Sequence, residues 1–257
     1  MTFWWQELRT NLARSFDDRS DQRWNHAIAT MPVSDRAAAM FRAVEDEFLL
    51  TGADTPRWDD PHRNPDFEWG RVNGPDDQAD VTDHAKFDIV HARARAWINV
   101  LRRWGGSERE NPEVDWATDD PFLASADHAE VLTSGIPDNP ELVIGFNDYV
   151  PDDHGVDLVA NVVIALGDPA VSLARVPDCG CDFCDYGSDV LLQQLDSLIF
   201  SIVDGSVEAQ SGGQYSGYRT SFDAAGELSG DAAHKPAKHR ARPWFDDWSP
   251  RPMQDWA

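Results

Sequence analysis

The chain has 257 residues, with 46 Asp or Glu against 22 Lys or Arg, so its formal net charge is −24. A field of that sign repels nucleic acid and anionic membranes, and we expect neither as a partner. The acidic residues are scattered along the chain, which favours a solvated acidic surface over a site for a basic partner. Apolar residues make up 41% of the chain, enough for a large core without disulfides.

The sequence predicts a soluble cytoplasmic protein. Its first residues carry neither the basic nor the apolar region of a signal peptide. The longest apolar run, near residues 156–166, is interrupted by Asp157 and Asn161 and is shorter than the roughly 20 residues that span a bilayer. Three cysteines in one cluster are not typical of a secreted disulfide framework.

The first half of the chain is predicted to be helical. A helix over residues 3–16, with Trp4 or Trp5 on its apolar face, is expected to dock on the protein's own core, within an extension over residues 1–34. Ser34 is predicted to cap the next helix, which ends near Thr51. The buried face of that helix is expected to contain Ala37, Met40, Phe41, Val44 and Phe48.

Two further features complete this half. The stretch 53–82, rich in Pro, Asp, Gly and Trp, is predicted to be a long loop that Trp58 and Trp69 pin to the core. Residues 83–104 are predicted to form a helix with a single apolar stripe, followed by a polar loop to residue 126. The stripe consists of Phe87, Val90, Ala94, Trp97, Leu101 and Trp104.

The second half is predicted to be an antiparallel sheet with one long amphipathic helix. That helix covers residues 189–203, with Ser188 as its cap. Strands are expected at 130–134, 142–146, 156–166, 171–176, 206–210 and 215–222, the third and fourth forming a hairpin. The fold class is therefore α+β: one domain over residues 35–228, with a helical part at 35–126 and a sheet-plus-helix part at 127–228.

The last segment, residues 229–257, is expected to be disordered or weakly docked, because it lacks periodicity. Its basic residues are expected to pair with the acidic body rather than with phosphate; they are Lys235, Lys238, Arg240 and Arg242. Its Trp residues offer a short motif through which an unknown protein partner could bind.

The main candidate site is the stretch 177–188, in which Cys179, Cys181 and Cys184 form a C-x-C-x-x-C pattern. Three thiolates and one further ligand suit a tetrahedral zinc ion, the fourth ligand being His154, a neighbouring Asp or water. The adjacent carboxylates are expected to raise the thiol pKa values, which opposes nucleophilic reactivity, whereas a bound cation would lower them.

Two other interpretations of the cysteines stay open. The three thiols can be reduced residues of a tight turn, or Cys181 and Cys184 can act as a redox C-x-x-C pair beside a helix N-terminus. A second group, His84, Asp88 and His91, has helical ligand spacing, but we interpret it as an ordinary polar helix face. The chain contains no G-x-S-x-G, P-loop or G-x-G-x-x-G motif.

Several segments resemble a set of actinobacterial proteins of unknown function that carry this cysteine loop. They are the Arg71-Val-Asn-Gly segment, the helix from Lys86 to Leu101, the Thr51-Gly-Ala-Asp-Thr-Pro segment, and the run from Gly167 through the cysteine loop to Val203. The resemblance covers about residues 35–225, so the N-terminal helix and the tail look like additions. It implies an architecture and no catalytic residues.

We therefore expect a non-enzymatic protein with a binding or scaffolding role and a structural zinc site at the three cysteines. The alternative is a thiol-based redox sensor or an enzyme that uses the same cysteine loop, with residues 53–82 as a lid.

Overall fold

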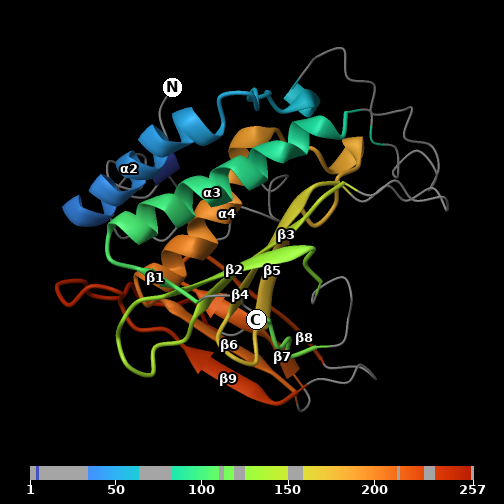
Figure 1. Cartoon of the computed structure of the whole chain (residues 1–257). Coiled ribbons are helices and arrows are strands. Elements are labelled where there is room, and N and C mark those ends of the chain that lie inside the picture. Colours follow the sequence, from blue (N-terminus) through green and yellow to red (C-terminus); the bar gives the residue numbers. More distant parts are fainter. Residues whose placement is uncertain are drawn as a thin grey trace.

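The computed structural model describes residues 4–5, 34–63, 81, 83–109, 113–118, 125–149, 159–212, 215–228 and 235–255. In this part of the chain, three long helices lie together beside two antiparallel sheets (Figure 1). The helices are α2 (Asp35–Thr51), α3 (Asp88–Arg103) and α4 (Ser188–Val203), with short 3₁₀ turns η1 (Pro61–Arg63), η3 (Ala85–Phe87) and η4 (Asp182–Cys184). The predicted α+β class is confirmed.

The first sheet has the order β1-β2-β3-β4-β5 and the second β8-β7-β6-β9. The first consists of β1 (Ser107–Glu108), β2 (His128–Thr133), β3 (Leu142–Asn147), β4 (Asn161–Leu166) and β5 (Val171–Val176). The second consists of β6 (Val207–Ser211), β7 (Tyr215–Thr220), β8 (Ala224–Leu228) and β9 (Ala237–Arg240). The sequence predicted a single sheet, but α4 separates β5 from β6 along the chain, and the later strands pair with one another instead.

The predicted apolar faces of the helices are confirmed. Ser34 Oγ accepts the Ala37 amide at 3.2 Å, which caps α2, and the five residues predicted for its inner face are all buried. On α3 the predicted stripe is buried from Phe87 to Leu101, while Trp104 is half-buried. The main core contains residues of all three helices and of both sheets, because each contributes one apolar face to it.

The start of α4 differs from the prediction. Gly187 occupies the N-cap position, and Ser188 is the first helical residue, without a capping hydrogen bond of its own. The Ser188 hydroxyl bonds the backbone of Trp58 instead. Helix propensity could not show this, because the partner lies 130 residues away in the chain.

The predicted hairpin at β4 and β5 is confirmed, since the two strands pair antiparallel. The strand predicted over 156–166 begins at Asn161, and residues 151–158 lie outside the described range. β5 contains a bulge: Ile164 faces Ala174 and Ala165 faces Ser172, so Leu173 has no counterpart on β4.

The C-terminal segment differs most from its prediction as a disordered or weakly docked tail. β9 pairs with β6, Trp244 is only 5% exposed, and the Gln254 amide donates to Thr220 O at 2.7 Å. Residues 235–255 are ordered because they cover the free edge of β6 and add apolar residues to the core. A four-residue strand such as β9 is too short to show a recognisable periodicity in the sequence.

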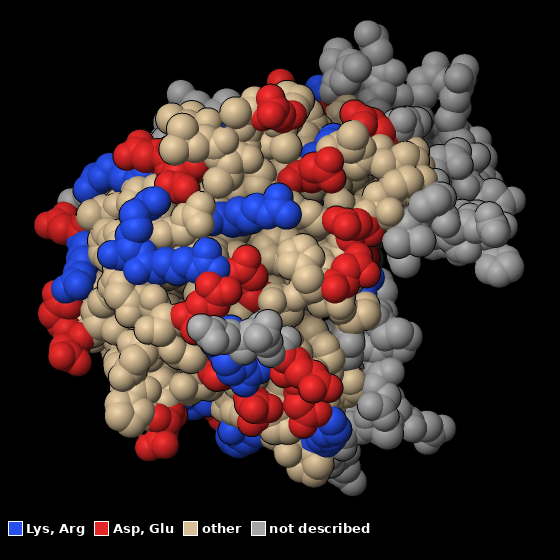
Figure 2. Space-filling view, viewed as in Figure 1, with Lys and Arg blue, Asp and Glu red and all other residues tan. Residues whose placement is uncertain are grey.

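Charge pairing in this segment follows the prediction for two of its basic residues. Lys235 pairs with Asp115, and Lys238 Nζ lies 3.0 Å from Glu208 Oε1. On the face shown in Figure 2, acidic side chains are spread over the surface and interspersed with Lys and Arg. This distribution of charges agrees with the predicted solvated acidic surface.

Some predictions fall outside the described part of the chain. These are the N-terminal helix beyond Trp4 and Trp5, most of the loop over 53–82 with Trp69, and the residues His154 and Trp256. Trp4 and Trp5 are helical and pack against Phe41 of the core. Among the described helices, none has the length and apolar character needed to cross a bilayer.

Candidate metal centre

The cysteine loop connects the end of β5 to the start of α4 and contains η4. It brings together all three predicted ligands: the sulfur atoms of Cys179, Cys181 and Cys184 lie within 4.8 Å of one another. The Sγ atoms of Cys179 and Cys181 are 3.2 Å apart. In a tetrahedral site with Zn–S bonds of about 2.3 Å, sulfur atoms are about 3.8 Å apart. Small side-chain movements would therefore bring the three sulfurs onto one ion.

The environment favours the protonated thiols of Cys179 and Cys184 when no cation is bound. The pKa values of Cys179 and Cys184 are both raised, chiefly because their sulfurs are desolvated, with interactions among the three cysteines contributing further. The predicted direction is therefore right for these two thiols, but the predicted cause, the neighbouring carboxylates, is not the main one. A cation at the cluster would favour the thiolates instead.

Asp185 fixes the shape of the loop through hydrogen bonds that use both of its carboxylate oxygens. Trp58 Nε1 donates to its two carboxylate oxygens at 2.8 and 3.0 Å, and Lys86 Nζ lies 2.7 Å from Oδ2. The Gly187 amide donates to Oδ1 at 2.9 Å. With both oxygens engaged and the residue buried, Asp185 is a structural anchor of the loop rather than a ligand.

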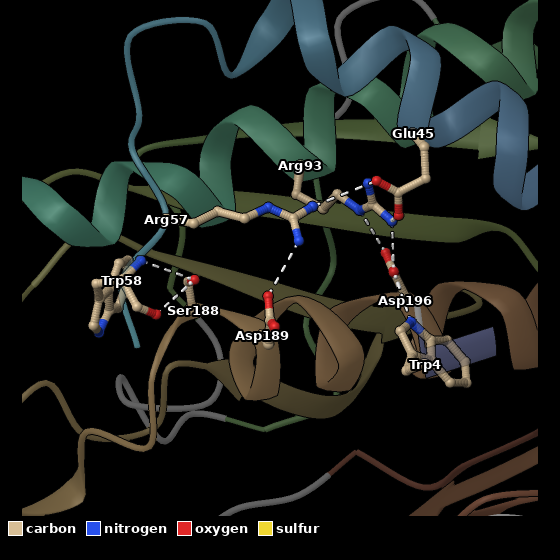
Figure 3. Close-up of polar contacts among 8 residues, drawn as sticks. All are labelled: Trp4, Glu45, Arg57, Trp58, Arg93, Ser188, Asp189 and Asp196. Carbon is tan, nitrogen blue, oxygen red and sulfur yellow. Dashed lines mark hydrogen bonds and ion pairs between the residues drawn. The ribbon is translucent and has the colours of Figure 1, made fainter. Parts of the chain in front are cut away.

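A second anchor ties the loop to the segment before η1 (Figure 3). Ser188 Oγ accepts the Trp58 amide at 3.2 Å and donates to the Trp58 carbonyl at 3.1 Å. Gly187 has φ +86°, and a Cβ there would lie 2.7 Å from the Asp60 nitrogen. Glycine is required because the two segments touch through their backbones. The prediction that Trp58 pins its stretch to the core is confirmed.

The fourth ligand can come from few places. Asp178 is exposed beside Cys179, and Asp182 Oδ1 lies 3.7 Å from Lys86 Nζ. His154 lies outside the described residues. Val159 adjoins the loop so closely that a Cβ on Gly180 would lie 2.4 Å from it.

The group His84, Asp88 and His91 does not form a site. His91 is 5% exposed, and its Nε2 lies 3.0 Å from the Asn161 carbonyl, while burial lowers its pKa. The ring of His84 lies against Tyr149, at 4.3 Å between centroids. The polar-face interpretation is thus wrong for His91, which belongs to the interior. Within the described residues, the cysteines are the one group close enough to share a metal ion.

Sequence reasoning missed a buried polar cluster beside this site, shown in Figure 3. Arg93 of α3 donates to both carboxylate oxygens of Asp196 of α4, at 2.8 and 2.7 Å, and to Glu45 of α2 at 2.7 Å. A signal was present, because Arg93 lies three residues after Val90 and Asp196 four residues after Leu192, on the apolar stripes of their helices. Opposite charges inside two facing stripes predict a buried ion pair.

Searches of curated proteins and of solved structures found no match. One protein family does match, over residues 44–255, and it is described as a family of unknown function, DUF6226. The matched range contains the cysteine loop and extends through β9, so the tail is part of the family's domain and not an addition to it. The chain belongs to DUF6226, a family of unknown function.

Proposed function

We propose that the cysteine loop binds one zinc ion through Cys179, Cys181 and Cys184, and that the ion holds the junction between β5 and α4. The convergence of the three sulfur atoms within 4.8 Å carries this proposal. Sulfur-rich tetrahedral sets favour zinc among the common divalent ions. The anchors at Asp185 and Ser188 support it, because they hold the loop in place before any ion binds.

The role of the protein is binding or scaffolding, with zinc as a structural element. A structural zinc site is closed by a fourth protein ligand, whereas a catalytic site keeps a position for water. Thiol ligands persist in a reducing compartment, which supports the cytoplasm as the location. A protein partner bound through the tail remains a prediction. Trp244 is buried and Trp248 packs half-buried against Phe200 and Phe245, which leaves Trp256, outside the described residues, as the candidate contact.

The test is the metal content of the purified protein, measured together with its thiol count and melting temperature. We expect one zinc per chain, three thiols that react only after chelation, and a lower melting temperature after metal removal. Bound zinc at about a thousand times its Kd stabilises the folded state by about 4 kcal/mol. Cys179→Ser, Cys181→Ser and Cys184→Ser should each lose the zinc.

Two exchanges serve as matched controls and also test the fourth ligand. Asp178→Asn and Asp182→Asn change the same loop without removing a sulfur, so zinc should be retained unless that carboxylate is itself the fourth ligand. Cobalt(II) in place of zinc reports the ligand set by its absorption spectrum. Metal-free protein, or zinc retained in all three Cys→Ser variants, would overturn the proposal. A reversible disulfide between two of the cysteines in metal-free protein would support the thiol-based sensor instead.

A further inference from the structure

A hollow of about 310 Å³ lies where the edge of the first sheet meets the second sheet. Its walls come from residues 117–118, from β5, and from strands β6, β7 and β8. None of its lining residues belongs to the cysteine loop or to the buried ion-pair cluster. Its volume is at the lower end of the range found for small-molecule sites.

The sequence builds this hollow from small residues. Seven of the eleven lining residues are Gly, Ala or Ser, on strands whose inward positions are elsewhere filled by larger side chains. Facing strands with small residues on both sides cannot close the space between the sheets. The hollow is therefore part of the fold and not a gap left by a single side chain.

The bulge in β5 lies in one wall of this hollow. Leu173, the residue without a counterpart on β4, and its neighbour Ser172 both line it. β5 is the last strand of its sheet, and among the described residues the pairing beyond it is a single bridge between Trp116 and Ala170. Bulges at sheet edges turn side chains away from regular pairing and are frequent beside functional sites.

The walls are uncharged, although 26% of the chain is charged. They carry five hydroxyl groups, on Thr118, Ser172, Ser211, Ser216 and Tyr218. Ser172 Oγ is buried and has no hydrogen-bond partner among the described residues. Burial raises the pKa of Tyr218, so its phenol stays neutral. A charged ligand would find no counterion here, and its desolvation would oppose binding.

We propose that this hollow binds a neutral, mainly apolar small molecule with a hydroxyl or carbonyl group that bonds the hydroxyl of Ser172. The apolar surfaces of Val171, Leu173 and Tyr218 hold the body of the ligand. This site goes beyond the proposed zinc function and does not depend on it.

The first test uses two fluorescent probes with the same ring system. N-phenyl-1-naphthylamine is neutral, whereas 8-anilino-1-naphthalenesulfonate adds a sulfonate. In high salt, which screens the net charge of the protein, we expect saturable binding of one neutral probe per chain. The sulfonate should bind at least about tenfold more weakly, because its charge would be desolvated. No saturable binding of the neutral probe, or equal binding of the two, would overturn the proposal.

The second test fills the hollow. Ala225→Phe places a ring in it from β8 and should weaken binding of N-phenyl-1-naphthylamine at least about tenfold. Ala224→Phe is the matched control, because successive strand residues face opposite sides and Ala224 does not line the hollow. Its affinity should stay within about twofold of wild type. Unchanged binding by Ala225→Phe would place the probe elsewhere and overturn the proposal.

Circular dichroism and thermal melting check that Ala225→Phe and Ala224→Phe both fold. Should Ala225→Phe fail to fold, Ser172→Val tests the proposal instead, with a change on β5. It replaces a lining hydroxyl by a methyl group and adds a second methyl group on a strand that tolerates β-branched residues, so we expect at least about threefold weaker binding of the neutral probe. Unchanged affinity in that variant would overturn the proposal.

Discussion

At the scale of single residues, Arg93 and Asp196 are the most constrained charges described. Both are buried, and the carboxylate also accepts Trp97 Nε1 at 2.6 Å and Trp4 Nε1 at 3.1 Å. Burial alone would lower the pKa of Arg93, but Asp196 and Glu45 outweigh it and raise the pKa above its ordinary value. A buried ion pair offsets its desolvation only when hydrogen bonds satisfy most of its polar atoms. Here both oxygens of Asp196 and two of the three nitrogens of Arg93 are bonded, while Arg93 Nη1 has no partner among the described residues.

Removing one charge of this pair should therefore be costly. In Asp196→Asn the side chain keeps its shape, but Arg93 loses its closest buried counter-charge, and we expect the free energy of unfolding to fall by about 3 kcal/mol. Urea denaturation measures it. The control is Glu108→Gln, which breaks an exposed ion pair with Arg102 and should cost less than about 1 kcal/mol. Equal losses in the two variants would contradict the argument.

At the scale of elements, the start of α4 is fixed by contacts with Arg57 and Trp58, which are far away in the chain. The Ser188 hydroxyl bonds the Trp58 backbone, and Arg57 Nη1 lies 3.1 Å from Asp189 Oδ1 in the first turn of the helix (Figure 3). Glu45 forms ion pairs with Arg57 at 3.4 Å and with Arg93 at 2.7 Å. Through these contacts the segment before η1 is bonded to both α2 and α4, directly beside the cysteine loop.

Ser188→Ala should release this segment locally. The variant leaves the Trp58 amide without its side-chain acceptor, so we expect a loss of about 1 to 2 kcal/mol in unfolding free energy. Trypsin should then cleave the Arg57–Trp58 bond faster in the native protein, as mass spectrometry of the fragments would show. Ser197→Ala, whose hydroxyl bonds only Gln194 O within α4, is the matched control. Similar cleavage rates in Ser188→Ala and wild type would show that the contact does not hold the segment.

The sequence predicts those elements whose signal is local. The 3.6-residue stripes located α2, α3 and α4, and the short apolar runs located β3 and β5. It did not reveal β9, which pairs with β6 about 30 residues earlier in the chain. It also did not reveal β8, which forms a hairpin with β7 but consists of Ala, Gly, Glu and Leu, most of which are depleted in strands. In the candidate site it identified the three cysteines. It could not show the anchors of Asp185, because Trp58 and Lys86 lie 127 and 99 residues away.

At the scale of the whole molecule, the C-terminal segment closes the fold over one buried acid. Asp204 follows α4, is 2% exposed, and accepts the Ser206 amide at 2.9 Å and also the Ser206 hydroxyl. Arg251, which lies over the ring of Phe222, contributes the nearest opposing charge. Burial raises the pKa of Asp204 to about 7, although Ser206 and Arg251 act in the opposite direction.

This acid should make the stability of the protein depend on pH in a defined direction. Since the pKa of Asp204 is about 7 in the folded chain and about 3.8 when unfolded, the folded state holds the proton more tightly. The stability that Asp204 contributes therefore falls as the pH rises from about 4 to about 7, by up to about 4 kcal/mol. Asp204→Asn cannot ionise, so relative to wild type it should gain stability as the pH rises from about 4 to about 7.

The measurement is urea unfolding of both proteins at several pH values, since their difference cancels the carboxylates that they share. Desolvation alone would raise the pKa of Glu208, for example, but its bonds to Arg219 and Lys238 outweigh this and lower the pKa, so Glu208 contributes the opposite slope to both proteins. Asp46→Asn, the same exchange on the exposed side of α2, should follow wild type throughout. A constant difference between Asp204→Asn and wild type across this range would mean that Asp204 carries the same charge in both states.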